Sequence, residues 1–332
     1  MVTQDIEAVN ALVKEKSWFV SVLQQEIGKV IVGQTRLVDQ LLIGLLCNGH
    51  ILIEGVPGLA KTLAVRTLAR AIHASFQRIQ FTPDLLPADI TGTEIYRPET
   101  GSFVFQQGPI FHNLVLADEI NRAPAKVQSA LLEAMAERQV SVGRSTYELS
   151  PLFLVMATQN PIEQEGTYPL PEAQLDRFLM HVKIGFPDAA VERRILQQAR
   201  GEALNGETKP ERRVSQQAIF AARKEILGLY MADAVEEYLV QLVMATRTPA
   251  KFDPEMAEWI AYGASPRGSI ALDRCARAHA WLAGRDFVSP EDIQAVLFDV
   301  LRHRIILSFE AEAAGVDQDR VVQRILDVVA VA

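Results

Sequence analysis

One short stretch of the chain combines an apolar run, two glycines, a lysine and a threonine. It runs from Ile51 to Thr62 with the sequence Ile-Leu-Ile-Glu-Gly-Val-Pro-Gly-Leu-Ala-Lys-Thr. Glycines let backbone N–H groups curl around phosphate oxygens, and a helix that begins at Lys61 would add partial positive charge. Lys61 could then reach two phosphate groups, and the Thr62 hydroxyl could bind Mg²⁺. The spacing therefore predicts a P-loop, the Walker A motif of nucleotide-binding proteins.

This stretch departs at one position from the pattern G-x-x-x-x-G-K-[ST], because Ala60 precedes the lysine. Alanine is small enough for the turn, so the departure weakens the interpretation without refuting it. The alternative is a Gly/Pro turn that happens to precede a lysine, but the apolar run before it and the amphipathic run after it favour the P-loop. The predicted nucleotide-binding residues are Gly55, Val56, Pro57, Gly58, Leu59, Ala60, Lys61, Thr62 and Leu63.

Two acids end another apolar run, Leu114–Glu119. In a parallel sheet the carboxyl ends of the strands share one edge, so Asp118 and Glu119 can face the phosphates. Asp118 would position Mg²⁺, together with Thr62, and Glu119 would polarise the attacking water as a general base. By themselves the two acids could be solvated charge at a strand end. The P-loop upstream favours the catalytic interpretation.

The elements that must position these residues alternate between strands and helices. Continuous apolar runs predict parallel strands covered on both faces at Ile51–Ile53, Gln77–Phe81, Leu114–Glu119, Phe153–Thr158 and Leu179–Ile184. Helical spacing of apolar residues predicts helices within 5–27, around Leu37–Cys47, from Lys61 onward and over Lys126–Glu137. Alternating segments predict β-hairpins at Thr93–Gln107 and Gln139–Leu149.

Beyond Pro187 the apolar periodicity continues as helices to about Val331, and the strand patterns disappear. The chain of 332 residues has room for about two domains. We expect an N-terminal helical segment over 1–28, an α/β core over 29–186 and an all-helical domain over 187–332. The predicted fold class is therefore α/β, with a parallel five-stranded sheet, hairpin inserts and a second, helical domain.

Composition narrows the class of protein and its location. The net charge of −8 and the lack of any lysine or arginine run argue against nucleic acid as the main partner. Cys47 and Cys275 are far apart in apolar segments, which indicates buried free thiols in a reducing cytosol. The first residues lack the pattern of a signal peptide, and the apolar stretch Leu41–Cys47 is too short to span a bilayer. We expect a soluble cytoplasmic protein without membrane insertion.

Five motifs in order along the chain carry a resemblance to a known family. They are Gly55-Val-Pro-Gly-Leu-Ala-Lys-Thr62, Leu116-Ala-Asp-Glu-Ile-Asn-Arg-Ala-Pro124, Ala157-Thr-Gln-Asn-Pro161, Leu170-Pro-Glu-Ala-Gln-Leu-Asp-Arg-Phe178 and Gly263-Ala-Ser-Pro-Arg-Gly268. Together they closely resemble the MoxR family of AAA+ ATPases over about residues 25–325. The alanine before Lys61 is usual in that family. The resemblance implies an AAA+ core followed by a helical lid domain.

Two polar residues acquire roles through this resemblance. Asn160 matches sensor 1, whose amide orients the lytic water, although an Asn-Pro turn without function is the alternative. Arg177 matches the arginine finger, which acts on the ATP of the neighbouring subunit and therefore implies a ring. A guanidinium suits that task because it is permanently charged, planar and bidentate towards phosphate. The alternative is an intrachain ion pair of Arg177 with Asp176 or Glu172.

Arg267 matches sensor 2, which the lid contributes to the γ-phosphate. Ser265-Pro266 predicts a helix start, so this arginine would lie in a first turn, where the helix dipole disfavours a cation. A nearby anion would resolve that conflict, which gives weak support to a phosphate-binding role. The resemblance thus implies that Arg267 joins the nucleotide site through the lid.

Further segments match the family without a signal of their own. Val32, Gly33 and Gln34 match residues that pack around the adenine, and Arg122 suggests an intersubunit or phosphate-side role that the sequence leaves unassigned. The two hairpins match inserts that line the central opening of the ring. Their aromatic residues could contact substrate or could pack on each other. The candidates are Tyr96, Phe103 and Phe105.

The resemblance implies a hexameric ring that hydrolyses ATP with Mg²⁺ and remodels a client protein, for metal-cofactor insertion or complex maturation. The usual partner in the family is a von Willebrand factor A (VWA) domain protein with a metal-ion-dependent adhesion site. Three alternatives remain open: a motor subunit of a magnesium-chelatase-type complex, a nucleotide-gated assembly scaffold with little turnover, and a nucleic-acid motor. The acidic balance argues against the last of these.

Overall fold

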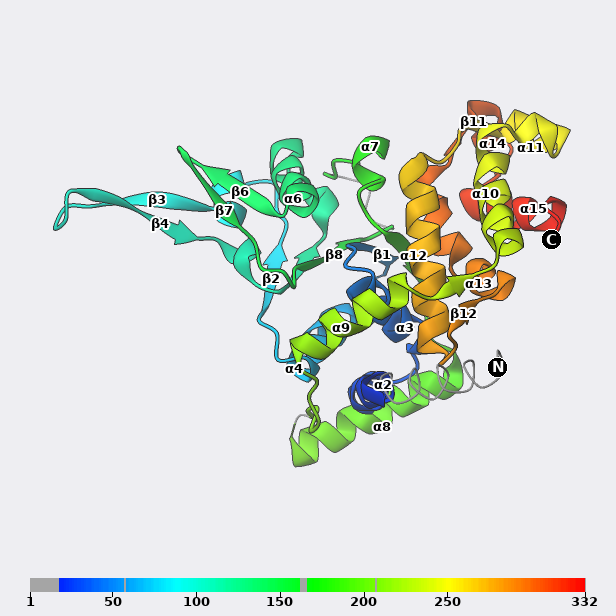
Figure 1. Ribbon diagram of the computed structural model, residues 1–332. Coiled ribbons are helices and arrows are strands. Elements are labelled where there is room, and N and C mark those ends of the chain that lie inside the picture. The colour runs from blue at the N-terminus through cyan, green and yellow to red at the C-terminus, as the bar shows by residue number, and fades with distance from the viewer. Residues whose placement is uncertain (1–17, 57, 162–165, 207, 332) are drawn as a thin grey trace.

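The computed structural model describes residues 18–56, 58–161, 166–206 and 208–331. A parallel five-stranded sheet with the strand order β2-β5-β8-β1-β9 lies at the centre of the first part of the chain (Figure 1). All five strands predicted from apolar runs are confirmed. Their bounds are β1 Ile51–Gly55, β2 Phe76–Gln80, β5 Leu114–Asp118, β8 Leu154–Gln159 and β9 Met180–Ile184.

Helices cover both faces of this sheet. They are α2 Trp18–Val30, α3 Thr35–Leu46, α4 Lys61–Ala71, α5 Pro87–Thr91, α6 Ala125–Glu137 and α7 Glu172–Leu175, with 3₁₀ turns η1 Pro109–Phe111 and η2 Ile120–Arg122. Residues 1–17 of the predicted N-terminal helical segment lie outside the described residues, and α2 is the part that the structure describes. Ile51 and Ile53 pack against α2, α3 and α4, whereas Leu52 packs on the opposite face with α6. The inner strands β1, β5 and β8 are therefore mostly apolar, whereas the edge strands β2 and β9 also carry polar residues.

Two β-hairpins extend away from the sheet on the side opposite the later helices (Figure 1). They are β3 Gly92–Arg97 with β4 Ser102–Gln107, and β6 Gln139–Val142 with β7 Ser145–Glu148, as predicted. The Phe105 ring stacks on the Tyr147 ring at 3.9 Å between centroids, which joins the two hairpins. Tyr96 and Phe103 face each other across the first hairpin yet remain 52% and 67% exposed. Phe105 therefore packs internally, and the other two rings are accessible.

The chain beyond Pro187 is helical, as predicted, with two very short ladders among the helices. Its helices are α8 Ala189–Asn205, α9 Gln216–Leu227, α10 Asp233–Arg247, α11 Pro254–Trp259, α12 Pro266–Leu282, α13 Pro290–Leu301, α14 Phe309–Ala313 and α15 Gln318–Val328, with 3₁₀ turns η3 Pro249–Lys251 and η4 Arg302–Arg304. The ladders are β10 Tyr230–Met231 with β12 Phe287–Val288, and β11 Ile260–Tyr262 with β13 Ile306–Leu307. Strands of two or three residues are too short to leave an alternating pattern, so the sequence did not predict them.

The two cysteines lie where the sheet region meets the helical domain. Both are free and buried, as predicted, but they are neighbours in space, one at the end of α3 and the other in α12. Burial and a hydrogen bond with the Cys47 thiol raise the pKa of Cys275 well above its usual value. Among the described helices, none has the length and apolarity that crossing a membrane requires.

Candidate active site

The loop between β1 and α4 borders a cavity of about 400 Å³, which we call the P-loop cavity. Its walls come from the loop, from the start of α4 and from the carboxyl ends of β2, β5 and β8. The lining residues are Gly58, Leu59, Ala60, Lys61, Thr62, Leu63, Arg78, Asp118, Glu119, Thr158 and Asn160. The structure thus brings together the predicted loop, both strand acids and the sensor 1 candidate. Pro57 lies outside the described residues.

Backbone constraints shape the loop. A Cβ atom at Gly55 would lie 2.9 Å from the backbone oxygen of Ile184, so only glycine fits beside β9 without a shift. Ala60 adopts a left-handed conformation with φ of 55°, which is strained for any residue with a Cβ atom. The smallest such side chain occupies this position, in agreement with the sequence argument. The turn leads directly into α4, whose first residue is Lys61.

Lys61 projects back across this loop. Its Nζ donates a hydrogen bond to the Gly55 carbonyl at 2.6 Å. Burial lowers the pKa of Lys61, while the charges of Asp118 and Glu119 act in the opposite direction. Partial burial strengthens the attraction of an ammonium group for phosphate, and the two carboxylates favour its charged form. The lysine predicted to contact phosphate therefore lines the P-loop cavity.

A threonine that the sequence did not single out holds both strand acids. The Thr158 hydroxyl donates to Asp118 Oδ1 at 2.5 Å and accepts from the Glu119 backbone N–H at 2.9 Å. Thr158 is 1% exposed and lies on β8, the strand that pairs with β5. Glu119 itself has a left-handed φ of 57°, which turns the chain away from the strand. The hydroxyl therefore fixes the two acids relative to each other.

Polar side chains from β2 and η2 also bind these acids. Arg78 donates to Asp118 Oδ2 at 2.9 Å from Nε and 2.6 Å from Nη2. Gln80 Nε2 donates to Glu119 Oε2 at 2.7 Å, and Arg122 Nε lies 3.1 Å from that oxygen. The structure thus gives the unassigned Arg122 a partner within its own chain. Arg78 and Gln80 were missed because the sequence does not reveal that β2 pairs with β5.

A second cavity of about 370 Å³ adjoins the same loop, and we call it the base cavity. Val32 and Gln34, which the resemblance places near the adenine, line it, whereas Gly33 packs so close to α8 that an added Cβ would lie 2.0 Å from a Val191 methyl. The wall contributed by α8 was not predicted, because apolar spacing marks a helix but not what it packs against. The lining residues are Val30, Ile31, Val32, Gln34, Gly58, Leu59, Ala60, Leu63, Phe186, Pro187, Glu192, Ile195, Gln198, Ala199 and Glu202.

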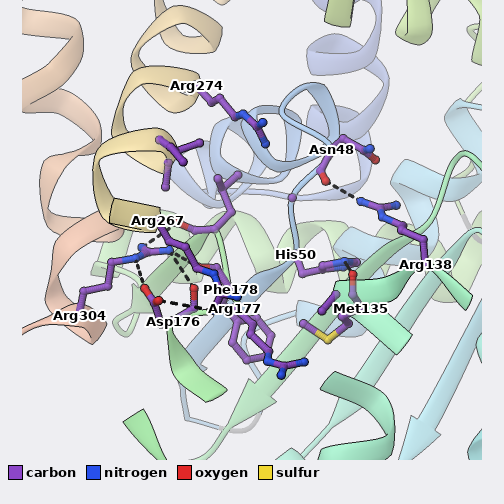
Figure 2. A pocket seen from close by; sticks show the side chains of 15 residues that line it. Asn48, His50, Met135, Arg138, Asp176, Arg177, Phe178, Arg267, Arg274 and Arg304 are labelled. Carbon is purple, nitrogen blue, oxygen red and sulfur yellow. Dashed lines mark hydrogen bonds and ion pairs between the residues drawn. The ribbon is translucent and has the colours of Figure 1, made fainter. Parts of the chain in front are cut away.

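The remaining two predicted residues, Arg177 and Arg267, line a third cavity of about 330 Å³, which we call the arginine cavity (Figure 2). Its other lining residues are Asn48, Gly49, His50, Met135, Ala136, Arg138, Asp176, Phe178, Leu179, Ile270, Ala271, Arg274 and Arg304. Arg177 donates to the Leu132 carbonyl at 2.8 Å, which differs from the ion pair considered as its alternative. Asp176 is instead paired with Arg304 Nε at 2.9 Å and with Arg267 Nη1 at 3.6 Å.

Arg267 lines a different cavity from the P-loop residues of its own chain. The arginine lies at the start of α12, where Ser265 caps the helix, and it points to the arginine cavity (Figure 2). Asp176 is the nearby anion that the helix start required, so that requirement gives no support to a bound phosphate. The lid packs near the amino ends of β1 and β9, and sequence motifs cannot show this placement.

The P-loop cavity and the arginine cavity lie at opposite edges of the sheet. His50 directly precedes β1 and lines the arginine cavity, while Gly58 follows β1 and lines the P-loop cavity. A five-residue strand spans about 17 Å, further than an arginine side chain extends. Arg177 and Arg267 therefore cannot reach the P-loop of the chain to which they belong.

A central parallel sheet, a P-loop with two strand acids and a helical lid define a P-loop ATPase of the AAA class. In agreement, residues 50–180 match the ATPase family associated with various cellular activities, and residues 255–325 match the AAA lid domain.

Individual relatives narrow the family further. The chain is 48% identical over 308 residues to Chaperone MoxR1 of Mycobacterium tuberculosis, covering 92% of this chain and 80% of the relative. It is 37% identical over 297 residues to Protein MoxR of Paracoccus denitrificans, covering 84% and 86% of the two chains. A crystal structure of a proposed ATPase from Cytophaga hutchinsonii superposes with a TM-score of 0.89 at 47% identity, covering 100% and 99% of the chains. The chain therefore belongs to the MoxR family of AAA ATPases.

Proposed function

We propose that this chain binds ATP with Mg²⁺ and hydrolyses it in a ring of identical subunits. The observation that carries this proposal is the convergence of Lys61, Asp118, Glu119 and Asn160 on one cavity, while arginines gather at the far edge of the sheet. A heterologous contact that places the arginine cavity of one subunit over the P-loop cavity of the next would repeat around a closed ring. A hexamer is the ring size that the family resemblance implies.

Within each P-loop cavity the residues divide the work of phosphoryl transfer. Lys61 would bind the β- and γ-phosphates, and Glu119 would accept a proton from the attacking water. Gln80 and Arg122 hold the Glu119 carboxylate, so they act as positioning residues. Asn160, which is 7% exposed in the same cavity, would orient the water.

The Thr62 hydroxyl and the Asp118 carboxylate offer the hard oxygen ligands that Mg²⁺ prefers, and both line the P-loop cavity. Among the described residues no cluster of three or more acidic, histidine or cysteine side chains could hold a metal ion. This fits Mg²⁺, which is usually held by one or two protein ligands together with nucleotide phosphates and water. Bound in this way, Mg²⁺ would neutralise phosphate charge.

Arg177 and Arg267 would act together on the ATP of the neighbouring subunit. Both side chains line the arginine cavity, and the Arg267 side chain remains 58% exposed although its Nη1 lies 3.6 Å from Asp176 Oδ2. A planar guanidinium stabilises the charge on the transferring phosphoryl group. Hydrolysis would then change the contact between adjacent lids and cores, which is how chemistry could drive movement in the ring.

The work done by the ring would be chaperone-like remodelling of a client protein, with a VWA-domain protein as partner. The relative named Chaperone MoxR1 supports this class, and the exposed Tyr96 and Phe103 offer an apolar surface for a client. The adjacent free thiols of Cys47 and Cys275 suit the reducing cytoplasm that we propose as its location.

A chelatase-type motor is the weaker candidate. Similarity to the magnesium-chelatase subunit ChlI of Nicotiana tabacum is 31% over 195 residues, which covers 58% of this chain and 42% of that protein. A shared ATPase region accounts for a match of that extent.

The test is the ATPase rate per subunit measured against protein concentration, with mass determined alongside, with and without ATP and Mg²⁺. We expect the specific rate to rise as rings form, because Arg177 acts on a neighbour. The Glu119→Gln variant should bind ATP without hydrolysing it and serves as the control for contaminating ATPase. A flat specific rate in a species that stays monomeric would overturn the ring.

A further inference from the structure

The polar side chains that α8 contributes to the base cavity offer more hydrogen-bond acceptors than free donors. From α8 it receives Glu192, Gln198 and Glu202, each one or two helical turns from the next. Apolar side chains such as Val32, Leu63 and Ile195 supply surfaces suited to a flat ring. Four loop residues line both this cavity and the P-loop cavity, so one nucleotide could extend through both; they are Gly58, Leu59, Ala60 and Leu63.

Gln198 has both of its amide hydrogens committed. Its Nε2 donates to the Val30 carbonyl at 2.9 Å and to Glu202 Oε1 at 3.0 Å. A backbone carbonyl and a carboxylate can only accept hydrogen bonds, so the nitrogen of the amide must face them and its orientation is fixed. No described residue donates to Gln198 Oε1. The oxygen is therefore a pre-oriented acceptor at the cavity wall.

The two neighbouring carboxylates add to the same bias. Glu192 and Glu202 both line the base cavity, and an ionised carboxylate accepts hydrogen bonds without donating any. The α8 wall as a whole therefore suits a ring that presents a donor and disfavours one that presents an oxygen in the same place. Adenine carries an amino group at position 6, whereas guanine and hypoxanthine carry a carbonyl oxygen there.

We propose that Gln198, held by Val30 and Glu202, accepts a hydrogen bond from the 6-amino group of adenine and selects ATP over 6-oxopurine nucleotides. This inference rests on the proposed function, because it assumes that the two cavities hold a nucleoside triphosphate. Gln198 is a specificity-determining residue in this account. It has no part in hydrolysis, which takes place in the P-loop cavity.

The test compares three triphosphates by isothermal titration with Mg²⁺: ATP, purine riboside triphosphate, which lacks the 6-amino group, and inosine triphosphate. The Gln198→Met variant keeps the length of the side chain and removes the amide. Gln216→Met is the matched control, since Gln216 is a half-buried glutamine on α9 whose Nε2 likewise donates to a backbone carbonyl, that of His73, at 3.0 Å.

In the wild-type protein and in the Gln216→Met variant, we expect loss of the 6-amino group to weaken binding by about tenfold, the usual size of one hydrogen bond to a ligand. Inosine triphosphate should bind more weakly still, because its oxygen would face acceptors. In the Gln198→Met variant, ATP and purine riboside triphosphate should bind with equal affinity. Binding of purine riboside triphosphate at the wild-type level would show that the variant cavity is intact.

Two results would overturn the proposal in distinguishable ways. If ATP keeps its full advantage over purine riboside triphosphate in the Gln198→Met variant, Gln198 does not read the base, while nucleotide binding stands. If the wild-type protein binds none of the three triphosphates, the proposed function fails and base selection fails with it.

Discussion

The P-loop cavity and the arginine cavity differ in how their charges are balanced. In the P-loop cavity, Lys61 and Arg78 lie with Asp118 and Glu119, and side chains of the same subunit hold the acids. The arginine cavity instead collects five arginines, and Asp176 is the one carboxylate among its described lining residues. Where positive and negative side chains are similar in number, their charges are neutralised within the subunit. An excess of positive charge instead favours binding of an anion from outside the subunit.

The difference also extends to how each cavity is built. Strand ends of one parallel sheet place the P-loop residues, so their meeting follows from the sheet alone. The arginine cavity combines the segment before β9 with α12 and η4 of the lid, which are far apart in sequence. Its geometry therefore depends on how the lid packs. A movement of the lid would change the arginine cavity more than the P-loop cavity.

The largest effect should follow from removing the cation of the P-loop cavity. We expect Lys61→Ala to abolish ATP binding and with it all turnover, because no other ammonium lies among the described lining residues of that cavity. Titration with a fluorescent ATP analogue measures the loss. Lys126→Ala, which changes an exposed lysine at the start of α6, should bind normally. Normal ATP binding by Lys61→Ala would contradict the P-loop assignment.

Removing a cation from the arginine cavity should separate binding from turnover. We expect Arg177→Ala to bind ATP normally but to lose about 10³-fold or more in turnover, the scale typical of an arginine finger. ATP affinity and steady-state hydrolysis, measured on the same preparation, test this. Arg212→Ala, at an exposed arginine, is the matched control. Hydrolysis by Arg177→Ala at the wild-type rate would remove the finger assignment.

Rings that contain two different variants test the role of Arg177 further, because we propose that each active site combines the P-loop cavity of one subunit with the arginine cavity of its neighbour. In an equal mixture of Arg177→Ala and Glu119→Gln, an intact P-loop cavity meets an intact Arg177 at about a quarter of the interfaces. If interfaces act independently, activity should recover to about that fraction of the wild-type rate. No recovery in mixed rings would indicate that all sites must fire together or that Arg177 acts within its own subunit.

The smallest effect concerns stability, and it arises at the edge of the sheet where the arginine cavity lies. The Val155 N–H donates to His50 Nδ1 at 2.9 Å, so Nε2 carries the proton and donates to the Met135 carbonyl at 3.1 Å. Burial and the charge of Arg138 lower the pKa of His50 to about 3 from 6.5. Between these values the unfolded chain binds a proton that the folded chain does not, so stability falls as the pH decreases from about 6.5 to about 3.

The His50→Gln variant should lose part of this dependence, because glutamine can keep both hydrogen bonds without titrating. Chemical denaturation at pH 7 and pH 5 measures it, with a slope from one group of up to about 1.4 kcal/mol per pH unit. His303 is also buried with a lowered pKa, so some dependence should remain. His73→Gln, which replaces an exposed histidine, is the matched control. Equal slopes in all three proteins would contradict the assignment to His50.

Much of this protein could be predicted from sequence because local chemistry leaves local patterns. A strand buried on both faces must be apolar throughout, and a phosphate-binding turn must carry glycines before its lysine, so β1, the P-loop and α4 were found together. Asp118 and Glu119 followed, since parallel strands end at one edge of a sheet. Each of these inferences needed only residues close to one another in the chain.

Only the tertiary structure decided which elements became neighbours. The pairing of β2 with β5 brought Arg78 and Gln80 to the strand acids, and the packing of α8 on the loop at Gly33 placed Gln198 in the base cavity. The position of the lid brought Arg267 into the same cavity as Arg177, which the sequence motifs did not show. The pattern of apolar residues in a helix records that one face is buried, but the same pattern serves against many partners. The choice among them is made by the packing of the whole chain.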